Sequence, residues 1–128
     1  MAVSTDIVGN STKSMWENNS RFIGYVGDRI NGAKHGQGTE FYPDGSTYDG
    51  AWKNDMKNGF GKVIYSNGVV FEGTFVDDAK NGEATITWPD GKTFSGSFKN
   101  GKGDGAIIVG KNKIYEGEVN AQGQMHGR

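Results

Sequence analysis

The chain of 128 residues contains no cysteine and no leucine. Without cysteine there is no disulfide framework, no thiolate metal site and no cysteine nucleophile. The absence of leucine removes a strong helix former and argues against leucine-rich repeats. Only 34% of the residues are hydrophobic, and the longest apolar run, near 106–109, is far too short for a membrane-spanning helix. The sequence therefore excludes thiol chemistry and a helical membrane span.

The charges are balanced, with 14 basic and 15 acidic residues interspersed along the chain. A net charge of −1 gives nucleic-acid binding no electrostatic basis. The first residues lack the basic start and apolar run of a secretory signal, so we expect a cytoplasmic protein. Residues 1–20 are polar and aperiodic, and we expect a disordered leader there, followed by one domain over 21–128.

Glycine is abundant, with 22 residues, and it recurs with a period of 23. Aromatic-x-glycine pairs follow this spacing, the last after 21 residues: Tyr25-x-Gly27, Tyr48-x-Gly50, Phe71-x-Gly73, Phe94-x-Gly96 and Tyr115-x-Gly117. Two further glycine series keep the period: Gly36, Gly59, Gly82 and Gly105, and Gly45, Gly68 and Gly91. The units are therefore about 25–47, 48–70, 71–93, 94–114 and an incomplete 115–128, and such arrays present extended surfaces.

Residue alternation within each unit predicts strands. In the second unit Tyr48, Gly50 and Trp52 fall on one face of an extended segment. Asn67-Gly68 supplies a hairpin turn, because both residues tolerate positive φ. Two short strands per unit predict an all-β fold, an elongated single-layer antiparallel meander of stacked β-hairpins.

Cross-strand register is estimated from the turns. Centring a hairpin on a 53–60 loop sets Gly50 opposite Val63. Centring the next on Asn67-Gly68 sets Gly61 opposite Phe75. We therefore expect rings to lie over strand glycines, which have no Cβ to obstruct them.

These motifs resemble the MORN repeat (membrane occupation and recognition nexus), and the resemblance covers roughly 25–128. The best copy reads Tyr48-x-Gly50-x-Trp52, Gly59-x-Gly61, Asn67-Gly68. The resemblance implies a non-catalytic scaffold that binds proteins and organises cytoskeletal or membrane-adjacent assemblies, with a place at the periphery of a membrane or the cytoskeleton. It also leaves open the repeat portion of a larger enzyme, such as a lipid kinase or a SET-domain methyltransferase.

Three departures from the MORN pattern stand out. Arg29 replaces an aromatic residue in the first unit. In the fourth unit Ile107 takes the place of the second glycine, and we expect a turn two residues shorter. The fifth unit stops within its motif at 126–128, which favours a polypeptide that continues past Arg128 over self-association through this end of the sheet.

The face that carries the rings is the candidate binding site. A single twisted layer is expected to shelter its rings only partly, and open aromatic surface commonly marks recognition. We expect a peptide or helix in a concave groove lined by Tyr48, Trp52, Tyr65, Phe71, Phe75, Trp88, Phe94 and Phe98. Each ring also holds the repeat array together, so scaffold and contact roles overlap.

Other chemistry has weak support. Residues 105–111 approximate a phosphate-binding loop, but they read as a strand with no helix after it. Two isolated histidines, His35 and His126, and the acidic pair Asp77-Asp78 lack the spacing of metal ligands. We expect no catalytic residue, no metal and no cofactor.

Two further ligand classes stay open. Five lysines at one edge allow weak binding of anionic lipid, although nearby aspartates offset them: Lys53, Lys57, Lys80, Lys99 and Lys102. Aromatic hairpin repeats also form carbohydrate- and choline-binding modules. Those modules carry adjacent Trp/Tyr pairs, which this chain lacks.

Overall fold

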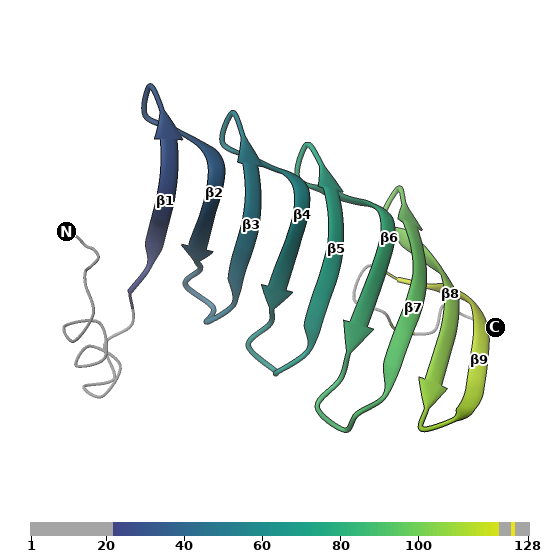
Figure 1. The fold of residues 1–128 in the computed structure, drawn as a ribbon. Coiled ribbons are helices and arrows are strands. Elements are labelled where there is room, and N and C mark those ends of the chain that lie inside the picture. The colour runs from purple at the N-terminus through teal and green to yellow at the C-terminus, as the bar shows by residue number, and fades with distance from the viewer. Residues whose placement is uncertain (1–21, 121–123, 125–128) are drawn as a thin grey trace.

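The computed structural model describes residues 22–120 and 124. These residues form nine antiparallel strands in one open sheet and no helix, and each strand pairs with its sequence neighbours (Figure 1). The strands are β1 Gly24–Ile30, β2 Ala33–Phe41, β3 Thr47–Lys53, β4 Met56–Ile64, β5 Val70–Val76, β6 Ala79–Thr87, β7 Thr93–Lys99, β8 Lys102–Val109 and β9 Asn112–Val119. The predicted single-layer meander is confirmed. The expected leader and the last residues of the fifth unit lie outside the described part.

A row of glycines crosses the sheet from β1 to β9. Each strand contributes one member, and neighbours pair directly: Gly27, Gly38, Gly50, Gly61, Gly73, Ala84, Gly96, Gly105 and Gly117. The predicted partners Gly50–Val63 and Gly61–Phe75 are therefore wrong, because each pairing is shifted by two residues. A ring does lie over a strand glycine, as expected, but at Gly61 it is the ring of Tyr48. A Cβ at Gly61 would overlap that ring.

The two ends of the strands carry different connections, which explains the error in register. At one end the turn has only two residues, such as Asn54-Asp55, with φ of 52° and 69°. Positive φ at both positions is the signature of a type I′ hairpin. The expected loop over 53–60 is mostly strand. At the other end the first three connections have five residues, such as 65–69, where the Tyr65 amide donates to the Val69 carbonyl and the Gly68 amide donates to the Tyr65 carbonyl.

The second glycine series bends the strands. Gly36, Gly59 and Gly82 have φ between 98° and 110°, a conformation that suits glycine, and each lies where the pairing is irregular. The fourth unit lacks this irregularity, since Gly105 pairs with Gly96 and Ile107 pairs with Phe94. Gly96 and Gly105 are therefore nine positions apart where Gly73 and Ala84 are eleven apart, and Ile107 does not replace a glycine. The expected shorter turn is also present, because two residues, Gly110-Lys111, join β8 to β9 where the other units have a five-residue connection.

The core lies on one side of the sheet, which we call the aromatic face. Its rings form a continuous series of edge-to-face contacts with centroids 5.0–5.6 Å apart: Tyr25–Trp52, Trp52–Tyr48, Tyr48–Phe75, Phe75–Phe71, Phe71–Phe98 and Phe98–Phe94. Edge-to-face geometry favours the ring quadrupoles. Along this series, contacts between two rings of one unit alternate with contacts between rings of neighbouring units. The rings therefore join successive repeats.

Candidate functional site

A groove of about 640 Å³ lies on the aromatic face. Its wall includes Tyr42 and Ser46 from the β2–β3 connection, and also Asp78 and Gly101 from the two-residue turns. These segments belong to opposite ends of the strands, so the strands curl until both ends flank the same space. The curl follows from the bulges at the second glycine series.

The rings predicted to contact a partner have two distinct environments. Six are at most 4% exposed: Tyr48, Trp52, Phe71, Phe75, Phe94 and Phe98. The expectation that the sheet leaves these rings half open is wrong, because the curled strands and the ring-to-ring contacts cover them. Tyr65 and Trp88 are half-buried and pack against the core from the five-residue connections. Tyr42 stands at the equivalent position of the first such connection, which sequence reasoning overlooked.

Lysine side chains lie over the rings. The Nζ atom of Lys34 is 4.8 Å from the Trp52 ring centroid, and that of Lys57 is 5.5 Å from both Tyr42 and Tyr48. Lys80 repeats the arrangement 4.6 Å from Phe71. Lysine stems cover apolar surface while the ammonium faces a ring quadrupole.

These lysines are spaced by 23 residues, a signal that was present in the sequence. Lys57 and Lys80 had been expected in loops at the edge of the sheet. They lie instead in β4 and β6 and reach into the groove. They are therefore less available to a lipid surface than the expectation assumed.

Burial changes the proton affinity of several groups in the groove. It raises the pKa of Tyr42 and of Tyr48 to about 12. Burial, together with repulsion from Lys57, lowers the pKa of Lys80 to about 8. The hydroxyl of Tyr48 donates to the carbonyl of Ala51 at 2.8 Å, so this tyrosine stays neutral and fixed at ordinary pH.

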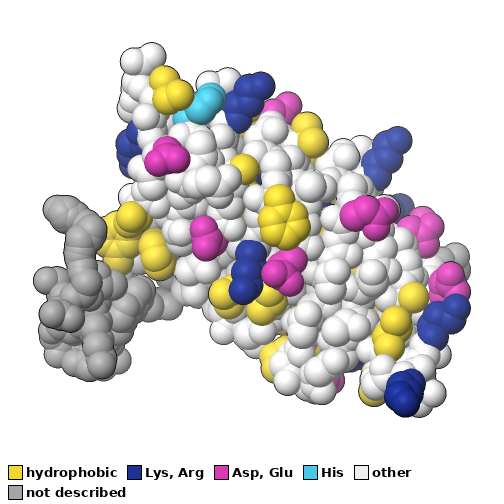
Figure 2. Space-filling view, viewed as in Figure 1, with side chains coloured by type: hydrophobic (Ala, Val, Ile, Leu, Met, Phe, Trp, Pro, Cys, Tyr) yellow, Lys and Arg dark blue, Asp and Glu magenta, His cyan; other side chains and the backbone are white. Residues whose placement is uncertain are grey.

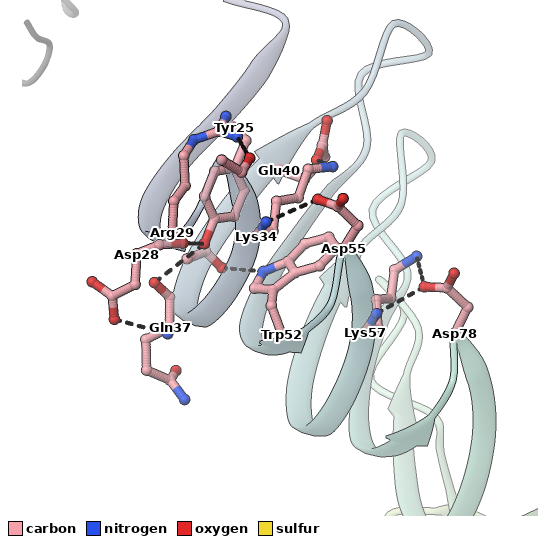
Figure 3. Close-up of polar contacts among 12 residues, drawn as sticks. Tyr25, Asp28, Arg29, Lys34, Gln37, Glu40, Trp52, Asp55, Lys57 and Asp78 are labelled. Carbon is pink, nitrogen blue, oxygen red and sulfur yellow. Dashed lines mark hydrogen bonds and ion pairs between the residues drawn. The ribbon is translucent and has the colours of Figure 1, made fainter.

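Aspartates in the turns connect neighbouring hairpins (Figure 3). Asp55 accepts a 2.8 Å hydrogen bond from the Lys34 amide, and its own amide donates to the Lys34 carbonyl at 3.0 Å. Asp78 and Lys57 repeat both bonds one unit later, at 2.8 and 2.9 Å. Asp78 also lies 3.9 Å from the Lys57 ammonium. The acidic turn residues are thus structural clamps between repeats.

Several other candidates have structural roles. The approximate phosphate loop is strand β8 followed by the Gly110-Lys111 turn. His35 accepts a long 3.4 Å bond from the Asn54 amide, while His126 is outside the described residues. Within the described ranges, no three His, Cys, Asp or Glu side chains cluster as metal ligands. No helix in that part of the chain is long and apolar enough to cross a membrane.

The opposite side of the sheet, the polar face, carries residues such as Asp49, Lys62 and Glu83. Isolated apolar side chains also lie there, and Phe60 is 60% exposed. Figure 2 shows acidic and basic side chains scattered over the surface in view, with no region of a single sign. This surface offers no concentrated field for a charged polymer.

The comparisons with known proteins agree with this architecture. A search of curated proteins gave no match. The family model described as MORN repeat matches three consecutive stretches, residues 25–47, 48–70 and 71–93, which correspond to the first three units. MORN repeats generally serve as scaffolds for protein or membrane interaction. Because the three matches span more than half of the chain, this protein belongs to the MORN repeat family.

Proposed function

We propose that this protein is a non-catalytic repeat scaffold that binds a segment of another protein along the groove of the aromatic face. The observation that carries the proposal is the groove itself, flanked by both ends of the strands and lined by apolar and charged side chains. Concave sites with an apolar floor and a few polar groups are the usual form of binding sites. We place the protein in the cytoplasm, at the periphery of a membrane or the cytoskeleton.

The contact residues follow from exposure. Of the buried rings, Phe75 lines the groove, whereas Trp52 lies outside its lining; both hold the repeats together. The half-buried Tyr42 and Tyr65 line the groove, with the ammonium groups of Lys57 and Lys80 over their rings. The tyrosine rings and the lysine stems present apolar surface, and each of these side chains ends in a polar group. This combination suits a peptide backbone and its side chains.

Site-specific photo-crosslinking tests the proposal. A benzoylphenylalanine at Tyr65 faces the groove, whereas the same residue at Lys62 lies on the polar face and serves as the matched control. With extract of the source cells, we expect one protein segment to crosslink from position 65 and not from position 62. Equal crosslinking from both positions, or crosslinking from position 62 alone, would contradict the groove as the binding surface.

A further inference from the structure

Lys80 occupies an unusual place for an amine. Its Nζ atom lies 4.6 Å from the Phe71 ring centroid and 5.3 Å from that of Tyr65, and it donates a 2.7 Å hydrogen bond to the Tyr65 hydroxyl. The Phe98 ring is 5.9 Å away. Three rings therefore displace water from around the ammonium, and this desolvation is the main cause that lowers the pKa of Lys80.

A second ammonium enters the same space. Lys57 lines the groove with Lys80, and its charge disfavours protonation of Lys80 further. The carboxylates of Asp44 and Asp78 line the groove as well, and Asp78 lies 3.9 Å from the Lys57 ammonium. Desolvation in an apolar pocket and a neighbouring cation are the two conditions that activate amine nucleophiles in proteins.

The magnitude of the effect is large. A pKa of about 8 leaves roughly a quarter of Lys80 neutral at pH 7.5. An ordinary lysine has roughly one neutral amine in a thousand at that pH. Only the neutral amine has the lone pair that attacks an electrophile.

The groove also gives a small molecule access to this amine. Val63, Phe75 and Ala79 line it together with Lys80, so the groove that holds this amine has apolar wall area for an apolar ligand. Its volume of about 640 Å³ exceeds what a single aromatic ring requires. We propose that Lys80 is a covalent modification site that captures small apolar aldehydes as an imine within the groove.

The reaction needs no further reagent. The lone pair on Nζ attacks the carbonyl carbon, the carbonyl π electrons move to oxygen, and the proton released by nitrogen passes to that oxygen. The carbinolamine then loses its hydroxyl with one proton as water, and a C=N bond forms. The Tyr65 hydroxyl lies beside the nitrogen, where it can hydrogen-bond to the departing oxygen.

Reductive trapping provides the test. The full chain is incubated with benzaldehyde and cyanoborohydride at pH 7.5, and benzylation of each lysine is followed by mass spectrometry of a proteolytic digest. We expect Lys80 to react at least tenfold faster than the exposed Lys53 and Lys99. Its rate should rise from pH 6 and level off above about pH 8, where the amine is already neutral.

A pair of matched variants separates the local cause from general reactivity. Lys57→Met keeps the stem over the rings but removes the second ammonium, and should slow Lys80 labelling several-fold at pH 7.5. Lys102→Met removes an exposed ammonium outside the groove and should leave the rate unchanged. Equal labelling of Lys80, Lys53 and Lys99, or a Lys80 rate that Lys57→Met does not alter, would overturn the proposal.

Discussion

Alanine in place of Gly61 should destabilise the whole array. Gly61 lies in the middle of the glycine row, and a Cβ there would come within 3.0 Å of the Tyr48 ring, a separation that Cβ atoms essentially never show. The ring cannot easily move away, because Tyr48 is fully buried and packs against Trp52 and Phe75 at 5.0 and 5.2 Å. The substitution therefore forces a buried ring out of position.

Three effects set the size of the loss. Overpacking a core costs roughly 1–3 kcal/mol. A displaced Tyr48 also loses its hydrogen bond to the Ala51 carbonyl, which contributes about 0.5–1.5 kcal/mol. Replacing glycine by alanine also lowers the conformational entropy of the unfolded chain, which offsets about 0.4–1 kcal/mol of this destabilisation. We expect Gly61→Ala to lower the free energy of unfolding by about 2 kcal/mol.

Urea unfolding followed by tryptophan fluorescence measures this change. The slope with denaturant should stay constant while the midpoint falls. Lys62→Ala, next in sequence but exposed on the polar face, is the control and should alter stability by less than about 0.5 kcal/mol. An unchanged or higher midpoint for Gly61→Ala would refute the reasoning.

A double variant tests the proposed cause. The third unit carries Phe71 and Ala84 where the second carries Tyr48 and Gly61, so a ring without a hydroxyl accompanies a larger row residue. Tyr48→Phe removes the hydroxyl that fixes the ring, and Gly61→Ala should then cost about 1 kcal/mol less. Equal costs in both backgrounds would show that the Tyr48 hydroxyl and its bond to Ala51 are not what hold the ring against the methyl group.

Two further predictions concern Asp78 and Lys80. Asp78→Gly keeps the positive φ of the turn but removes the acceptor, so hydrogen exchange of the Lys57 amide should accelerate while the Lys34 amide, held by Asp55, stays protected; equal exchange changes at both amides would contradict a local clamp. Because folded Lys80 has a pKa of about 8 against 10.5 when unfolded, the unfolded chain binds more protons between these values. The free energy of unfolding should therefore rise from pH 8 to 9.5 by at most about 1.4 kcal/mol per unit, below the range where tyrosines ionise. Chemical denaturation of Lys80→Met should show no such rise, and a persisting slope would assign it to other groups.

Much of the fold could be predicted from the sequence because its signals are local. Alternating residues around Gly50 fix the strand faces, and the Asn67-Gly68 pair marks a connection, since both depend on backbone preferences of adjacent residues. The register could not be predicted in the same way. It depended on whether residues 53–60 form a loop or a two-residue turn at Asn54-Asp55, and both interpretations fit the local pattern.

The candidate site was only partly predictable. The six rings within strands were correctly assigned to one face, while Tyr65 and Trp88 lie in connections and pack against it; the exposure of all eight depends on how strongly the strands curl. Lys57 and Lys80 looked like edge lysines, because nothing local indicates that a side chain from one end of a strand reaches a ring near the other end. Their 23-residue spacing was the available signal.

The sequence by itself determined the repeat, the strand order and the identity of the apolar face, because hydrogen bonding between adjacent strands and a 23-residue period leave few alternatives. Only the tertiary structure decided that the glycines align in one row, that the bulges curl both strand ends over the rings, and that lysines cover those rings. Each of these depends on distances between residues 9 to 27 apart in sequence, from the 9 between Lys80 and Phe71 to the 27 between Phe71 and Phe98, and such distances are set by the pairing and curvature of the whole sheet.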